Sequence, residues 1–132
     1  MIDNVWDENI VVAFDFDGTI TKEDNYPCLD YEYNSNAIKW IKKIQELNII
    51  SVLWTCNNEE KIEKVTLELA EKYNIHFDYI NDYPYRGNSR KLNADVYIDD
   101  RANSGLLYWP VFYYRIKYLI RKRKKGYNNV RK

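Results

Sequence analysis

Cysteine, proline, glycine and histidine are all scarce in this sequence. Its 132 residues include two cysteines, three prolines, four glycines and one histidine. Cys28 and Cys56 match no metal-ligand spacing and are too few for a disulfide scaffold. His76 precedes an expected strand without a partner in the sequence, and we interpret it as structural. These residues therefore predict neither a cysteine-based metal site nor a disulfide-stapled domain.

Long apolar runs are also missing. No run approaches the roughly 20 residues that a membrane span requires. The N-terminus does not combine a positive segment with an apolar one, as a secretory signal would. There are no internal repeats, no low-complexity linker and no internal domain boundary. We expect one soluble domain located in the cytoplasm.

Acidic residues are absent from the C-terminal part of the chain. Residues 1–101 hold all 20 acidic and 11 basic residues, whereas residues 102–132 hold 9 basic residues and no acid. Aromatic residues make up 16% of the sequence, which argues against disorder despite 30% charged residues. We expect one folded domain over residues 1–120 and a basic tail over 121–132. The tail's charge suits a helix C-terminus, and the alternative is that it steers a polyanion toward a binding site on the domain.

Strand and helix patterns alternate along the chain. Apolar runs predict strands near residues 11–14, 49–54, 77–80 and 96–98, with the first in a central position. Helical spacing predicts helices from Ser35 or Asn36 to Leu47 and from Asn57 or Asn58 to about Tyr73. Residues 111–113 fit a last edge strand or the start of a final helix. This order predicts an α/β fold, a three-layer Rossmann-like sandwich with a mainly parallel sheet of about five strands.

Two carboxylates follow the first apolar run. Asp15 and Asp17 come at its end, and Gly18 then interrupts the strand. Unpaired acids inside a buried strand would cost many kcal/mol, whereas the carboxyl edge of a parallel sheet is where ligands bind. Ionised carboxylates at that edge favour a hard divalent cation. The pattern therefore predicts a ligand site at this edge.

Three further positions suit the same site. Thr55 ends the second strand, where a hydroxyl beside a helix N-terminus can hold phosphoryl oxygens. Lys91 supplies a positive charge that would offset the repulsion between a carboxylate and a phosphate. Asp99 and Asp100 end the fourth strand, and one of them would bind a cation directly while the other orients it.

These motifs resemble those of the haloacid dehalogenase (HAD) superfamily. The segment from Asp15 to Thr19 is similar to its first motif, DxDGT, and Leu53-Trp54-Thr55 to its second. Lys91 resembles the third motif and Asp99-Asp100 the fourth, so the resemblance covers about residues 10 to 101. Ser89 to Leu92 and Ile98 to Arg101 look like a small branch without a cap domain. That branch leads us to expect a basic residue shortly after Thr55, and Asn57 stands there instead.

The resemblance implies a phosphomonoester phosphatase that uses Mg2+. Asp15 would attack phosphorus to form an aspartyl phosphate, and Asp17 would act as the acid and base. It implies phosphate binding by Phe16, Gly18, Thr55, Cys56 and Lys91. It also implies metal binding by Asp15, by the backbone carbonyl of Asp17 and by Asp99, with Asp100 in support. The substrate stays open between a small molecule, such as a nucleotide, and a nucleic-acid end, and an oligomer is also left open.

The motif spacings leave no room for a cap domain, so an open cleft is expected. Aromatic and polar residues fall in the adjoining loops, where they can stack on a base or simply pack together. The candidate substrate contacts are Tyr26, Asn57, Tyr83, Tyr85, Arg86 and Arg90. The alternative function is a catalytically weak phosphate- or nucleic-acid-binding module on the same fold.

Overall fold

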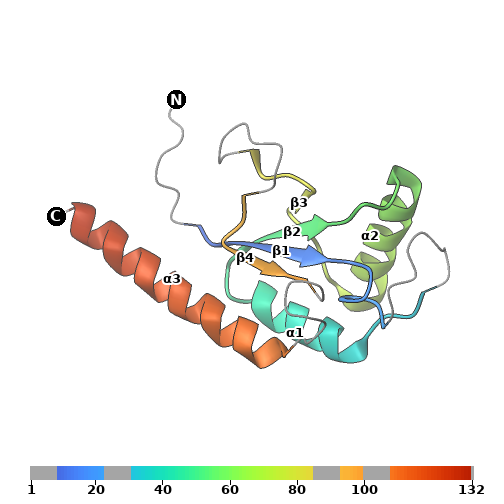
Figure 1. Ribbon diagram of the computed structural model, residues 1–132, viewed down its shortest axis with the longest axis horizontal. Helices are drawn as coiled ribbons and strands as arrows, with labels where there is room; N and C mark the ends of the chain where they lie inside the picture. Colours follow the sequence, from blue (N-terminus) through green and yellow to red (C-terminus); the bar gives the residue numbers. More distant parts are fainter. Residues whose placement is uncertain (1–8, 23–30, 85–92, 100–107, 132) are drawn as a thin grey trace.

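The computed structural model describes residues 9–22, 31–84, 93–99 and 108–131 (Figure 1). Within them, four strands form one parallel sheet in the order β3-β2-β1-β4. The elements are β1 (Val11–Asp15), α1 (Ser35–Gln45), β2 (Ile50–Trp54), α2 (Glu59–Tyr73), β3 (Tyr79–Ile80), β4 (Val96–Ile98) and α3 (Trp109–Arg131). The predicted α/β class, the parallel sheet and the central position of the first strand are confirmed. None of the helices in the described part is long and apolar enough to cross a membrane.

Of the two alternatives for residues 111–113, the start of the final helix is confirmed, and a fifth strand is wrong for the described residues. Positions 111–113 lie in α3, which begins at Trp109 and Pro110. Proline suits the first turn of a helix, where its missing N–H would have had no partner. Trp109 and Ile116, two turns apart, are both buried, as an inward helical face requires. The apolar run at 111–113 is therefore part of an amphipathic helix.

Asparagine residues cap the starts of α1 and α2 and the end of α2. Asn34 caps α1 by accepting hydrogen bonds from the backbone N–H groups of Asn36 and Ala37. Asn58 caps α2 by accepting from the N–H of Lys61. At the other end of α2, Asn74 takes a left-handed conformation with φ of 56°. The predicted helices are confirmed to within one or two residues at each end.

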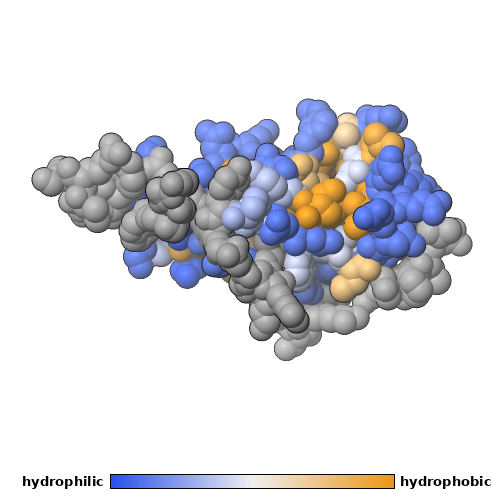
Figure 2. All heavy atoms as spheres, turned by 90° about the horizontal axis from the view of Figure 1, so that it is seen from above, coloured by the Kyte–Doolittle hydropathy of each residue, from blue (hydrophilic) through white to orange (hydrophobic). Residues whose placement is uncertain are grey.

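All three helices pack on the same face of the sheet. The main core joins residues of α1, α2 and α3 to alternate strand residues such as Phe14, Leu53 and Ile98. On the other face, Val11, Ala13 and Val52 pack with Tyr83. Figure 2 looks from the side opposite α1 and α3 and shows a patch of apolar residues among hydrophilic ones. The described residues thus form two layers instead of the three expected.

The strand order explains this one-sided packing. Two successive right-handed crossovers lead from β1 to β2 to β3 in one direction, so α1 and α2 lie on the same face. The chain then returns past β1 to β4, and this connection contributes Tyr83 to the second face. The predicted helices account for the first two crossovers only, and residues 85–92 of the return lie outside the described part.

Helix α3 runs back along the sheet to the amino ends of the strands (Figure 1). Near its end, Arg123 donates hydrogen bonds to the Asn9 carbonyl oxygen at 3.0 Å and to Asp95 Oδ1 at 2.9 Å. Asp95 also accepts from the Val11 N–H at 2.8 Å, so it joins α3 to the starts of β1 and β4. The expected boundary at residue 120 falls inside this helix. Its basic end lies at the edge of the sheet opposite the predicted site, a position that does not suit steering a ligand into it.

The segment between β1 and α1 forms a small hairpin that is joined to α2. Thr21 and Tyr33 make an antiparallel bridge. The hydroxyl groups of Tyr31 and Tyr33 both donate to Glu68 Oε1, at 2.7 and 2.6 Å. Burial, followed by the Glu68 hydrogen bond, raises the pKa of Tyr31 to about 12 and the pKa of Tyr33 further still. The hydrogen bond from Tyr33 in turn lowers the pKa of Glu68.

These tyrosines should make the folded chain sensitive to alkali. A tyrosine in the unfolded chain has a pKa near 10, whereas the pKa of Tyr31 in the folded chain is raised to about 12. The protonated tyrosine therefore stabilises the fold fully below pH 10, and this stabilisation is lost as the pH rises toward 12. The free energy of unfolding in urea should therefore fall between pH 10 and 11. The loss is at most about 1.4 kcal/mol per pH unit for each such tyrosine, and solvent screening reduces it.

Tyr33→Phe should flatten this decline, whereas the same change at Tyr118, which is 45% exposed on α3, should leave it unchanged. Equal slopes for the wild type and the Tyr33 variant would contradict the assignment.

Candidate functional site

The end of β1 is a tight turn that displays both acids. Gly18 has a φ of 79°, a left-handed conformation that glycine adopts without steric cost. The Phe16 carbonyl oxygen accepts hydrogen bonds from the N–H groups of Thr19, Ile20 and Thr21 at 2.9 to 3.2 Å. Thr19 donates its hydroxyl hydrogen to Asp15 Oδ2 at 3.2 Å. The turn therefore fixes the Asp15 carboxylate from within the same motif.

Asp15 lies beside the ends of both neighbouring strands. It is in register with Trp54, the last residue of β2. Phe14 is in register with Ile98, so Asp15 and Asp99 each follow a paired position on β1 and β4. Adjacent strands lie about 4.8 Å apart, which puts Asp15 close to both Thr55 and Asp99. The predicted meeting of these three positions at one edge of the sheet is confirmed.

This edge is also a topological switch point. The chain leaves β1 toward β2, whereas β4 lies on the other side of β1 and is reached by a separate connection. Open α/β sheets bind ligands in the crevice beyond the carboxyl ends of such strands. Asp15, the last residue of β1, and Asp99, the residue after β4, lie at this edge.

Thr55 and Asn57 form one hydrogen-bonded unit after β2. The Thr55 hydroxyl oxygen accepts from the Asn57 backbone N–H at 3.2 Å and from its Nδ2 at 2.7 Å. The Thr55 N–H donates to Asn81 Oδ1 at 2.7 Å. Asn57 Nδ2 also donates to Asp17 Oδ2 at 2.7 Å. Asn57, predicted as a substrate contact, thus connects the end of β2 to Asp17.

Lys61 is a site residue that the sequence analysis missed. Its side chain is 3% exposed, and its Nζ lies 3.5 Å from Asp17 Oδ1. The Nζ also lies 5.5 Å from the ring centroid of Phe16 and 5.6 Å from that of Tyr31. A signal was present, because Lys61 stands four residues before Val65 and eight before Leu69, on the buried face of α2. A lysine on an otherwise apolar helical stripe indicates a buried partner.

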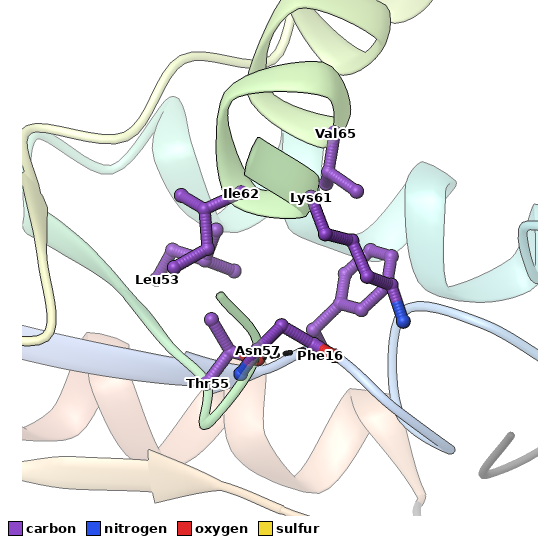
Figure 3. A pocket seen from close by; sticks show the side chains of 7 residues that line it. All are labelled: Phe16, Leu53, Thr55, Asn57, Lys61, Ile62 and Val65. Atoms are coloured by element: carbon purple, nitrogen blue, oxygen red, sulfur yellow. Dashed lines mark hydrogen bonds between the residues drawn. The ribbon is translucent and has the colours of Figure 1, made fainter. Parts of the chain in front are cut away.

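Lys61 and Asn57 line a small hollow between the end of β2 and the first turn of α2 (Figure 3). Its remaining walls are Phe16, Leu53, Thr55, Ile62 and Val65. The apolar walls lie toward the core, and the polar groups lie toward Asp17. Apolar surroundings strengthen the attraction between Lys61 and Asp17, because little water screens them.

Other predicted site residues occupy different surroundings. The Phe16 side chain is 1% exposed and packs in the main core. Its carbonyl oxygen accepts the hydrogen bonds that form the turn. Tyr83 is buried on the second face, with its ring centroid 5.4 Å from that of Tyr79. Cys56 carries a free, exposed thiol. Six predicted residues lie outside the described part of the chain: Tyr26, Tyr85, Arg86, Arg90, Lys91 and Asp100.

The oxygen atoms at this edge suit a hard cation. Among the residues that the structure describes, no three His, Cys, Asp or Glu side chains group so as to hold a metal ion. Asp15 and Asp99 nevertheless follow neighbouring strands at the same edge of the sheet, and the expected fourth ligand, Asp100, lies outside the described residues. Two carboxylates with main-chain oxygens are the donor chemistry that Mg2+ takes. The Asp17 carboxylate bonds to Asn57 and Lys61, so its main-chain carbonyl is the better candidate ligand.

A solved structure is similar to this chain in both sequence and fold. Protein-family models give no match, and neither do curated proteins. The solved structure is that of a conserved protein coded by a locus of Bacteroides thetaiotaomicron, which is 34% identical with a TM-score of 0.68. The match covers 83% of this chain and 90% of the other. At that identity and coverage, the chain belongs to the same family as this conserved Bacteroides protein.

Proposed function

We propose that this protein is a Mg2+-dependent phosphomonoester phosphatase of the HAD type. One observation carries the proposal: acids from β1 and β4 and the hydroxyl-bearing end of β2 meet at the switch point of a parallel sheet. A carboxylate nucleophile, a second acid two residues later and an oxygen-rich metal position are what phosphoryl transfer through an aspartyl phosphate needs.

Asp15 is the proposed nucleophile. It stands at the end of a strand whose preceding four residues are at most 1% exposed, so its backbone is held rigidly. The hydrogen bond from Thr19 to Oδ2 helps to hold the Asp15 carboxylate in one orientation. When the nucleophile is held rigidly, the bound phosphate meets it in a geometry close to that of attack. This can lower the activation free energy of phosphoryl transfer by several kcal/mol.

Asp17 is the proposed acid and base. In its protonated form, the Asp17 carboxyl group would give its proton to the leaving oxygen as the phosphoryl group moves to Asp15. The resulting carboxylate would then take a proton from the water that hydrolyses the intermediate, which restores the acid. Thr55 and the backbone amides at the start of α2 are proposed to bind phosphoryl oxygens, because a helix N-terminus favours anions. Lys91, outside the described residues, is proposed to add positive charge.

Mg2+, when bound by Asp15, the Asp17 carbonyl, Asp99 and Asp100, would offset the negative charge of the phosphoryl group. The substrate is proposed to be a phosphorylated small molecule or nucleic-acid end.

Asp15→Asn should abolish turnover of an artificial aryl phosphate in the presence of Mg2+. An amide does not attack phosphorus, so we expect kcat to fall by roughly a thousandfold or more. The control is Glu63→Gln, which neutralises an exposed acid on α2 and should leave kcat within about twofold. Substantial activity in purified Asp15→Asn would show that another residue is the nucleophile.

Mg2+ should stabilise the wild-type chain in the absence of substrate. A cation that binds the folded state alone raises the melting temperature by mass action. It also relieves the repulsion between the Asp15 and Asp99 carboxylates. We therefore expect millimolar Mg2+ to raise the melting temperature of the wild type and of Glu63→Gln, and to have little effect on Asp99→Asn. An equal rise in all three proteins would place the cation elsewhere.

A further inference from the structure

The buried ion pair between Lys61 and Asp17 is difficult to explain as a source of stability. Lys61 and Asp17 have side-chain exposures of 3% and 12%. Removing two charges from water is costly, and replacing a buried pair with apolar residues is often neutral or stabilising. An apolar residue at 61 would fit the stripe formed by Val65 and Leu69. The lysine therefore needs a reason other than packing.

The contacts around Asp17 supply that reason. Lys61 Nζ lies 3.5 Å from Oδ1, and Asn57 Nδ2 donates to Oδ2 at 2.7 Å, so each carboxylate oxygen has its own donor. Two donors on two oxygens fix both the position and the rotation of a carboxylate. Asp17 lies in the turn after β1, and both donors belong to the region where β2 leads into α2.

Lys61 is itself held from several sides. Its Nζ lies over the rings of Phe16 and Tyr31, at 5.5 and 5.6 Å from their centroids. Tyr31 is fixed by its hydrogen bond to Glu68, which lies on the same helix as Lys61. Asn57 is fixed by Thr55. Both donors to Asp17 are therefore preorganised rather than mobile surface groups.

We infer that Lys61, together with Asn57, is a positioning residue that aims the Asp17 carboxylate at the leaving oxygen of the substrate. This inference rests on the proposed phosphatase function and goes beyond it, because Lys61 belongs to none of the four motifs. The pair also accounts for Asn57 at the place where a basic residue was expected. The positive charge near Asp17 comes instead from Lys61, in the first turn of α2.

The test uses the dependence of the rate on the leaving group. An acid that protonates the leaving oxygen matters much for phenyl phosphate and little for p-nitrophenyl phosphate, whose leaving group is stable without a proton. Lys61→Met keeps a straight side chain of similar length and removes the charge. We expect it to lower kcat/KM for phenyl phosphate by about a hundredfold and for p-nitrophenyl phosphate by less than about fivefold. Asp17→Asn should show the same imbalance.

Lys64→Met is the matched control. Lys64 is exposed on α2 and its Nζ also lies 5.6 Å from the Tyr31 ring centroid. It should change neither rate by more than about twofold. An equal loss for both substrates in Lys61→Met would overturn the inference and leave the phosphatase proposal standing. A wild-type chain that hydrolyses neither substrate would overturn the proposed function, and the inference with it.

Thermal unfolding tests the contact without any activity. Asp17→Asn removes the carboxylate charge beside the buried Lys61 ammonium, and should lower the melting temperature by several degrees. In the Lys61→Met background the same change should have little effect, because the charge at position 61 that Asp17 compensates is already gone. Equal losses in the two backgrounds would show that Lys61 and Asp17 are not coupled. Coupling without the leaving-group imbalance would make the pair structural, and would also overturn the positioning role.

Discussion

Carboxylates cannot be buried without compensation, and this constraint governs how the whole site is built. Strand β1 is fully enclosed by β2 and β4, yet it ends in Asp15 and leads directly to Asp17. Each acid receives its own compensation: a hydroxyl from Thr19 for Asp15, and an amide and an ammonium for Asp17. Compensation by nearby, oriented donors is also what prepares such groups for catalysis, since donors that are already placed need no reorganisation during the reaction.

The same constraint connects parts of the chain that have no other reason to meet. Lys61 neutralises Asp17 and lies against Tyr31, whose hydroxyl group shares the Glu68 carboxylate with Tyr33. The hairpin after β1 is thereby joined to α2 on the side of the sheet where the helices pack. At the opposite edge, Asp95 joins the starts of β1 and β4 to α3, because its carboxylate accepts hydrogen bonds from the Val11 N–H and from Arg123. The Arg123–Asp95 ion pair thus joins the basic part of the sequence to the acidic part at this edge.

Local patterns in the sequence predicted much of this arrangement, and long-range pairings were missed. Apolar runs that end in acids or in Thr55 predict the strands, their parallel arrangement, and the single sheet edge at which Asp15, Thr55 and Asp99 lie. Apolar spacing predicts α1 and α2 but does not single out Lys61, a charged residue on the same face as Val65 and Leu69. Among the described residues the helices lie on one face of the sheet. That placement depends on the strand order, which the alternation of strands and helices in the sequence does not reveal. The position of the basic segment depended on the Arg123–Asp95 contact, between residues 28 apart, which no local pattern encodes.

Phosphorylation of Asp15 is the step on which the proposed mechanism depends. Asp17→Asn should slow hydrolysis of the intermediate, so this variant can be incubated with Mg2+ and p-nitrophenyl phosphate and then treated with borohydride, which reduces an aspartyl phosphate to homoserine. Peptide mass spectrometry should find homoserine in place of Asp15 only when both Mg2+ and the aryl phosphate are present. Reduction at any other carboxylate, or p-nitrophenol release by this variant with Asp15 unmodified, would contradict the account.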